Sequence, residues 1–420
     1  MVHCRYTKYA ASSLVGTLLV LACQLPFVIA DTEFLPANTQ GLENSADFAG
    51  TLSTDFQLEP VRLVQDVQTA PGQIVAPPPS AAAPPFRRGL RRARVRLAGL
   101  PPMFGDSLAP SLQLTTSGTF NNTSDVPLGG AARRAKIAEN NKALPVDRIY
   151  FAYHHFHNAL QADTDPFTPG FDRTSSLERY TLGLEKTFCC KNWSVELRMP
   201  FNDKYRFQDN SGFNVEGGSV GNLAVILKRL VHLSEHSATA IGVGLDLPTG
   251  SDVDGTGFSK FTFRNEAVHF TPFVGTLWHP TDSFFMNAFV QFDFAANGNE
   301  IRTDDARIVL NEQNLFQIDA SVGRWLYRCP GSSTLTGIAG ILELHYTTTI
   351  QDADNRGSFS GEFESIEQPG NRLDLLQLTS AIHVGLGRCT SLRVGGVFPL
   401  RDDYDELFDA ELAVQLNRRF

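Results

Sequence analysis

The chain has 420 residues, of which 42% are hydrophobic and 19% are charged, and its formal net charge is −9. The apolar content excludes a globally disordered chain, and the net negative charge argues against nucleic acid held by a broad basic field. Beyond about residue 30 no apolar run reaches the ~18 residues of a membrane helix, which excludes a multi-pass helical membrane protein.

Residues 1–30 have the features of a secretory signal peptide. Arg5 and Lys8 give a positive start, and the following uncharged segment is rich in Leu and Val. The segment ends at Val28-Ile29-Ala30, which offers small or modest residues at the two positions that a signal peptidase reads, so we expect the cut after Ala30. A cut before Cys23, as in a lipoprotein, is the alternative. We therefore predict an exported bacterial protein.

Residues 31–100 are predicted to be a disordered periplasmic arm. A Pro/Ala-rich run at 76–85 is typical of a polyproline-like linker, and a cluster of arginines follows at 87–96. We interpret the arginines as a solvated tail. The alternative is an anchor for anionic cell-wall or lipid groups. Residues 101–147 show no clear helix or strand pattern and are predicted to be an irregular linker or a barrel plug.

From Arg148 onward the sequence alternates between apolar and polar residues, which is typical of strands with two unlike faces. The segment from Trp193 to Phe201 is the clearest case. Most of the segments are longer than the five or six residues usual in soluble sheets, and they suit the ~9–11 residues of a strand that crosses a bilayer. About twelve strands are expected, at 148–159, 177–188, 193–201, 220–233, 238–247, 267–278, 283–295, 314–328, 335–347, 373–386, 391–400 and 408–420.

Short and long connections alternate along the whole series of strands. Short turns are expected near 189–192, 234–237, 279–282, 329–334 and 387–390, and the intervening loops are long. Outer-membrane barrels sort their connections in this way, with short periplasmic turns and long external loops. The predicted fold is therefore all-β: a transmembrane antiparallel up-and-down β-barrel over 148–420. A soluble exported sandwich is the alternative.

The ends of the predicted strands fit a membrane interface. Lys186, Arg229, Arg324 and Arg418 point toward the apolar side, but each lies near a short turn or the C-terminus, where a long cation can reach head groups. The chain stops at Phe420, which resembles the C-terminal targeting signal of outer-membrane barrels. Outer-membrane lipid and the barrel-assembly machinery are the partners that this ending implies.

Two motifs carry a family resemblance over roughly residues 130–420. The stretch from Pro145 to Tyr153, preceded by Lys136–Asn141, resembles the β-barrel porins of planctomycete-type bacteria. The stretch from Gly242 to Gly250 also resembles outer-membrane transporters linked to phenol degradation. The resemblance implies an outer-membrane barrel porin or transporter, and it brings no catalytic residues.

The polar faces of the strands carry charges that we expect to line the lumen. In one interpretation they form a wet lumen that favours cations, and in the other they pair across adjacent strands and fill the interior. We also predict that Arg133, Arg134 and Lys136 lodge in the acid-rich lumen as part of a plug. The candidate lumen charges are Arg179, Glu185, Glu196, Arg198, Lys228, Asp246, Asp293, Asp319, Glu343, Arg393, Asp409 and Glu411.

The sequence predicts no metal site, no cofactor and no enzymatic activity. His155 and His157 share one strand face without an adjacent acid, and the acidic loops near Asp252 and Asp352 lack a full calcium ligand series. The stretch from Gly217 to Gly221 matches the spacing G-x-S-x-G, but it lies at the end of a loop between two predicted strands and not at the strand-to-helix turn of a nucleophile elbow.

Four cysteines, Cys189, Cys190, Cys329 and Cys389, remain after signal removal, and all four fall in predicted short turns. In an exported protein this suggests disulfides. A Cys329–Cys389 bridge and a Cys189–Cys190 bridge are both candidates, and the sequence leaves the pairing open.

The function predicted from these features is a porin-like channel that passes small solutes through a charged lumen. The alternative is a structural or surface-interaction protein with a closed barrel and functional external loops.

Overall fold

The computed structural model describes residues 5–6, 85–108, 112–116, 122–126, 132–164, 173–203, 205–208, 214–256, 260–303, 307–353, 365–367, 372–401 and 406–420. The predicted signal peptide and the predicted arm therefore lie outside the described residues, except for β1 (Arg5–Tyr6), which pairs with β17, and the last part of the arm. None of the described helices has the length and apolar character needed to cross a membrane.

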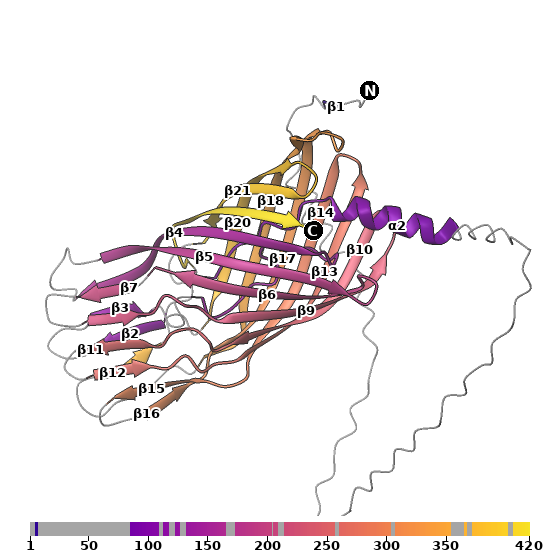
Figure 1. Cartoon of the computed structure of the whole chain (residues 1–420). Helices are drawn as coiled ribbons and strands as arrows, with labels where there is room; N and C mark the ends of the chain where they lie inside the picture. Colours follow the sequence, from indigo (N-terminus) through magenta and orange to yellow (C-terminus); the bar gives the residue numbers. More distant parts are fainter. Residues whose placement is uncertain are drawn as a thin grey trace, which may run out of the picture. The chain divides into compact units, whose positions relative to one another are not determined.

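Twelve antiparallel strands form a closed barrel (Figure 1). The last strand pairs with the first from Ala410↔His157 to Arg419↔Arg148, so the barrel wall has no open edge. The predicted barrel of about twelve strands is confirmed. Its strands are β4 (Arg148–Thr164), β5 (Arg173–Phe188), β6 (Trp193–Asn202), β9 (Leu223–Leu233), β10 (Ser237–Leu247), β13 (His269–Thr281), β14 (Phe284–Ala295), β17 (Asn314–Arg328), β18 (Leu335–Gln351), β20 (Asp374–Leu386), β21 (Thr390–Pro399) and β22 (Ala410–Arg419).

The barrel wall has polar side chains on its inner face and apolar side chains on its outer face, the reverse of a soluble protein with an apolar core. Along β6, the polar residues Glu196 and Arg198 are buried, whereas Leu197 between them is exposed. Across the barrel, large apolar side chains face outward, and Leu182 and Ile382 are 52% and 55% exposed. A soluble barrel would not leave so continuous an apolar surface in water. The outer face is therefore suited to an apolar surrounding.

Three of the predicted long loops contain strands. The segments at 202–219, 248–266 and 296–313 are predicted as long connections; each contains a hairpin, and the hairpins pair side by side in a six-stranded sheet. Pairing satisfies backbone groups that an extended loop would otherwise leave to water. The strands of this sheet are β7 (Tyr205–Gln208), β8 (Asn214–Gly217), β11 (Val253–Thr256), β12 (Lys260–Phe263), β15 (Asn299–Thr303) and β16 (Arg307–Leu310).

The segment predicted to be irregular between residues 101 and 147 also contains two strands. They are β2 (Leu112–Thr116) and β3 (Asn122–Val126), which pair with each other. β3 extends the pairing of β4, and β2 pairs with β19 (Ser365–Glu367).

The end of the predicted disordered arm is a helix, α2 (Pro85–Ala98). This corrects the prediction for these residues. A proline is tolerated in the first turn of a helix, and the Arg, Leu and Ala that follow are strong helix formers. Ala93 and Leu97 share one face by their i, i+4 spacing and are buried, whereas Val95 is 70% exposed. Arg94 also donates a 2.6 Å hydrogen bond to the carbonyl of Lys191, which fixes the helix to the β5–β6 turn.

The cysteines do not pair as the sequence suggested. Cys329 is in a disulfide, whereas Cys189, Cys190 and Cys389 are free thiols. Both candidate bridges, Cys329–Cys389 and Cys189–Cys190, are therefore wrong. Cys189, Cys190 and Lys191 have φ angles of 45°, 59° and 65°, so the adjacent cysteines form a tight left-handed turn rather than a vicinal bridge.

Candidate functional site

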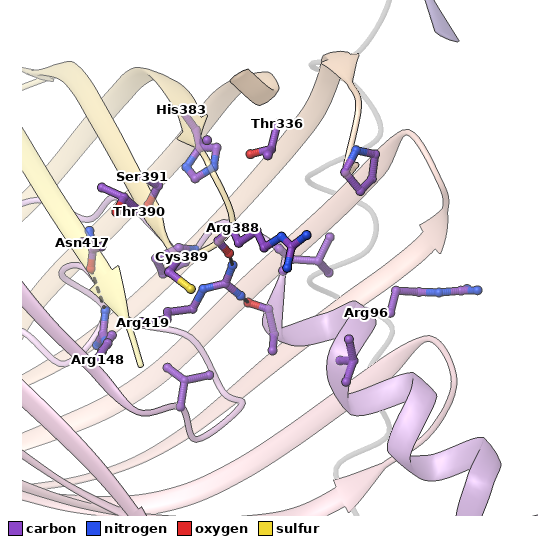
Figure 2. A pocket seen from close by; sticks show the side chains of 18 of the residues that line it. Arg96, Arg148, Thr336, His383, Arg388, Cys389, Thr390, Ser391, Asn417 and Arg419 are labelled. Atoms are coloured by element: carbon purple, nitrogen blue, oxygen red, sulfur yellow. Dashed lines mark hydrogen bonds between the residues drawn. The ribbon is translucent and has the colours of Figure 1, made fainter. Parts of the chain in front are cut away.

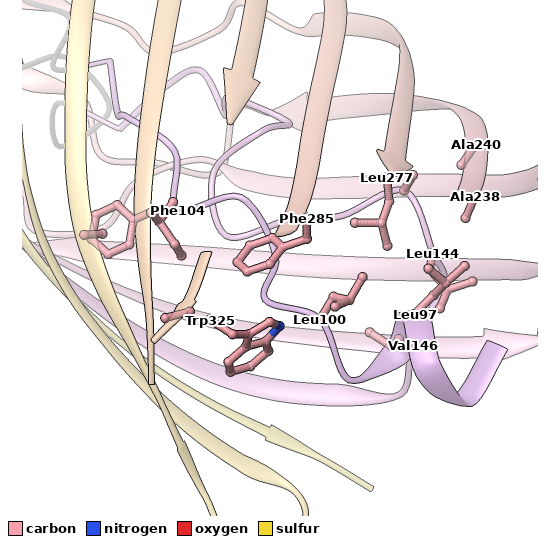
Figure 3. Packing of buried hydrophobic residues seen from close by; sticks show 14 of the residues in the cluster. Leu97, Leu100, Phe104, Leu144, Val146, Ala238, Ala240, Leu277, Phe285 and Trp325 are labelled. Carbon is pink, nitrogen blue, oxygen red and sulfur yellow. The ribbon is translucent and has the colours of Figure 1, made fainter. Parts of the chain in front are cut away.

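The interior of the barrel is filled by the chain that precedes β4. This interior segment, defined as residues 97–108 and 132–147, passes inside the barrel wall (Figure 3). Phe104, Lys136 and Asn141 are at most 1% exposed, although they belong to no barrel strand. The candidate site is therefore the contact between this segment and the inward faces of the strands.

Eleven of the twelve predicted lumen charges are buried inside the wall. They are Arg179, Glu185, Glu196, Arg198, Lys228, Asp246, Asp293, Asp319, Glu343, Arg393 and Glu411.

The prediction that Asp409 lines the lumen is wrong. Asp409 is exposed and accepts a 2.6 Å hydrogen bond from Asn158. Its neighbour Phe408 is buried instead, with its ring 5.4 Å from that of Phe156. The alternation of faces begins only where β22 begins, at Ala410, so the pattern could not be extended back to residue 408.

Wall carboxylates bind backbone amides of the interior segment. The two carboxylate oxygens of Glu343 accept hydrogen bonds from the amides of Phe104 and Gly105 at 2.8 and 2.7 Å. Asp246 accepts from the amide of Ala135 at 3.0 Å. Hydrogen bonds to a charged acceptor are stronger than neutral ones, and they satisfy amides that have no strand partner. The acids of the wall thus hold the segment through its backbone.

Wall arginines bind the carbonyls of the same segment. Arg393 donates to the carbonyls of Pro102 and Met103, each at 3.0 Å. Arg198 donates to the carbonyl of Lys136 at 2.8 Å, and Arg179 donates to the interior segment in the same way. Both signs of charge on the wall are therefore occupied by the segment.

The three predicted plug cations form buried ion pairs with the wall. Arg134 Nε lies 2.9 Å from Asp293 Oδ2, and Arg133 pairs with Glu312. Lys136 Nζ lies 3.1 Å from Asp319 Oδ1. Glu312 was missed from the sequence because it lies in a segment predicted to be an external loop.

Lys136 occupies a cluster of metal-ligand types. Asp106, Asp319 and His345 each present a potential metal-ligand atom within 4.8 Å of the other two. Lys136 Nζ lies 2.5 Å from Asp106 Oδ1 and thus supplies the positive charge. Burial lowers the pKa of Lys136, but Asp106 and Asp319 together outweigh it and raise the pKa. The ammonium therefore remains charged and fills the position that a cation would take.

A histidine missed by the sequence analysis also contacts the interior segment. His154 Nδ1 lies 2.5 Å from Glu411 Oε1, and His154 Nε2 lies 3.3 Å from Glu139 Oε1. Burial raises the pKa of Glu139, but the hydrogen bond and charge of His154, with two arginines, lower it to about 2. Strand parity was the available signal, because it places His154 on the face opposite His155.

At the short-turn end, wall charges pair with one another. Lys228 Nζ lies 3.0 Å from Glu185, and Arg198 Nε lies 2.8 Å from Glu196. Arg148 bridges the two acids at 2.8 and 3.2 Å. These five charges therefore follow the second interpretation from the sequence, in which charges pair across adjacent strands and fill the interior.

Apolar side chains of the segment complete the filling. Leu100, Phe104 and Leu144 join a buried cluster with Phe285 and Trp325 of the wall (Figure 3). The wall residues that face these side chains are small, which leaves room for the interior segment. They include Ala238, Ala240, Ala339, Ala381 and Ala413.

Gly105→Ala should destabilise the fold by about 1–3 kcal/mol, because a side chain is strained there. Gly105 has a φ of 85°, and an added Cβ would lie 2.4 Å from the Cα of Glu139. Urea unfolding of the refolded protein measures the change. Gly89→Ala on α2 is the matched control, since an added Cβ there has no neighbour within 4 Å. An equal effect of both substitutions would contradict this account of Gly105.

Comparison with known proteins gives similarity in strand architecture only. An outer-membrane channel from Pseudomonas putida F1 has 13% identity and a TM-score of 0.43, and the match covers 66% of this chain and 97% of that one. The NanC porin has 8% identity and a TM-score of 0.36, with 65% and 98% covered. A Pseudomonas aeruginosa FadL homologue has 10% identity and a TM-score of 0.31, with 74% and 100% covered.

At these identities and TM-scores no functional argument rests on the similarity. The chain matches no family model and no curated protein sequence. The resemblance to planctomycete-type porins and to phenol-linked transporters thus stays a prediction.

Proposed function

We propose that the protein is an outer-membrane channel for small solutes whose lumen is occupied by the interior segment. The closed wall with an apolar outer face supports a position in a bilayer, because the barrel strands pair with one another around the whole wall and leave no open edge. The short turns then face the periplasm, as in other barrels of this type.

The observation that carries the proposal is the pairing of the wall charges with the interior segment. A barrel with a purely structural role can fill its interior with apolar side chains. This wall instead presents Asp246, Glu343 and Arg393 to the backbone of a separate segment. Polar contacts of this kind can exchange for water. We therefore assign it the role of a plug.

A closed barrel with functional external loops remains the second candidate. The six-stranded sheet built from three loops supports it, because these loops form an ordered surface. Neither proposal assigns a catalytic residue.

Solute uptake by liposomes that contain the refolded full chain separates the two candidates. A channel should admit a small neutral sugar and potassium ions above the level of protein-free liposomes. Uptake at the protein-free level, in liposomes shown to contain the folded barrel, would contradict the channel and favour the closed barrel.

A further inference from the structure

A cavity of about 700 Å³ lies at the short-turn end of the barrel (Figure 2). Helix α2, both ends of the interior segment and the turns after β17 and β20 contribute to its lining. Its volume is in the usual range of small-molecule sites, roughly 300–1,000 Å³. The cavity is separate from the ion pairs that hold Arg133, Arg134 and Lys136.

The charge of the lining is one-sided. Eight Arg and Lys side chains of the described chain line the cavity, and no described Asp or Glu does. Like charges this close repel one another, and the repulsion grows where water is partly excluded. A counter-charge from outside the lining would relieve it.

Some of these cations are already engaged by the protein. Arg148 pairs with two glutamates of the wall. Arg419 and Lys142 both donate to the carbonyl of Ala98, at the end of α2, at 2.5 and 2.7 Å. Burial, with the nearby charges of Arg419 and Arg148, places the pKa of Lys142 well below its usual value. The positive charge of Lys142 is thus destabilised by burial and by its cationic neighbours, and its hydrogen bonds offset this only in part.

The outer cations have no such compensation. Arg92 comes from α2, and Arg388 comes from the turn between β20 and β21. In the described part of the chain, neither forms an ion pair with a carboxylate, and both are exposed. Two guanidinium groups from separate elements are therefore available to one ligand.

Buried donors without partners give an independent indication. Among the residues that the structure describes, Trp325 Nε1 and Asn417 Nδ2 have no hydrogen-bond partner, although the two residues are only 7% and 5% exposed. His383, which is 5% exposed, also has an unpartnered ring nitrogen, Nδ1. All three residues line the cavity, and Figure 2 shows His383 and Asn417 on its wall. A buried donor without a partner costs about 1–3 kcal/mol, so an acceptor is expected at this place.

The geometry points to a binding site for an organic phosphate, with Arg92 and Arg388 as the cations that hold the phosphate group and Asn417 and Trp325 as further donors in the same lining. A phosphate carries close to two charges and three acceptor oxygens, so it can accept from several directions, whereas a carboxylate has two oxygens in one plane. The guanidinium fork matches phosphate geometry. Inorganic phosphate would leave most of the cavity empty, and the apolar side chains of Leu100 and Trp325 suit an organic substituent.

Calorimetric titration of the refolded full chain in neutral detergent tests the site, with phenyl phosphate as the probe and benzoate as the carboxylate of similar size. Phenyl phosphate should bind saturably, and it should bind more tightly than benzoate. Arg92→Gln with Arg388→Gln should weaken it by about tenfold or more, because two charge-assisted contacts are lost. Both residues are exposed, so folding should be preserved.

Arg229→Gln is the matched control, since Arg229 is an exposed arginine near the same end that stacks on Trp193 outside the cavity. No saturable binding of phenyl phosphate, equal weakening in the control, or equal affinity for benzoate would overturn the site. A competition titration with phosphatidic acid, a lipid that carries a phosphate monoester, identifies the natural source. Displacement of the probe by this lipid supports a lipid head group, and retention of the probe supports a soluble organic phosphate. The outcome does not depend on whether the barrel conducts.

Discussion

Deletion of residues 101–146 should raise the single-channel conductance of the refolded barrel several-fold in planar bilayers. These residues supply most of the chain inside the wall, whereas the wall itself closes through strand pairing. Without them, water can reach Asp246, Asp293, Asp319, Glu343 and Glu411, which outnumber the wall cations that the deletion also releases. The open pore should therefore favour cations, and the reversal potential in a salt gradient measures this preference.

Deletion of residues 31–82 is the control, because it shortens the chain and leaves the interior segment intact. It should leave conductance at the level of the full chain. Each deletion variant must first show the heat-dependent gel mobility of a folded barrel. Unchanged conductance in a folded 101–146 deletion would contradict the proposed plug.

Lys136→Met should lower the free energy of unfolding by about 3–5 kcal/mol, the usual cost of breaking a buried ion pair by removing one partner. Lys136 is 1% exposed, and its ammonium lies between Asp106 and Asp319. The substitution keeps the length of the side chain but leaves two buried carboxylates with the imidazole of His345 as their neighbour. Urea unfolding in detergent, followed by tryptophan fluorescence, gives the change.

Lys186→Met is the matched control for this loss. Lys186 also pairs with an aspartate, Asp147, at 3.2 Å, but its side chain is 64% exposed. An exposed pair contributes about 0–1 kcal/mol, so the control should change stability little. A small effect at both positions would contradict the buried network as the anchor of the interior segment.

The barrel could be predicted because its physical signal is local. Alternating residues such as Glu196, Leu197 and Arg198 report the two faces of a strand directly, and loop lengths report the two ends of the barrel. Of the twelve charges that the same parity predicts for the lumen, eleven are buried. It failed at Asp409, where the chain has not yet entered β22.

The partners of those charges could not be predicted, because they depend on a segment without periodicity. The contact of Glu343 with the amides of Phe104 and Gly105 joins residues more than 230 positions apart and uses backbone atoms, which carry no sequence signal. Strand parity also gave no prediction for Glu312. This residue follows β16, which pairs with β15 of the same loop and not with a barrel strand. The helix at Pro85–Ala98 was hidden by its charge, since few apolar residues mark its buried face.

Fluorescence quenching by lipids with brominated acyl chains tests the outward apolar face most directly. Trp278 lies on a barrel strand and is 42% exposed, whereas Trp325 is 7% exposed and joins the interior cluster. A variant with Trp193→Phe and Trp325→Phe leaves Trp278 as the single reporter in proteoliposomes, and a variant with Trp193→Phe and Trp278→Phe leaves Trp325. The account predicts strong quenching of Trp278 and weak quenching of Trp325. Equal quenching of the two, or none at Trp278, would contradict it.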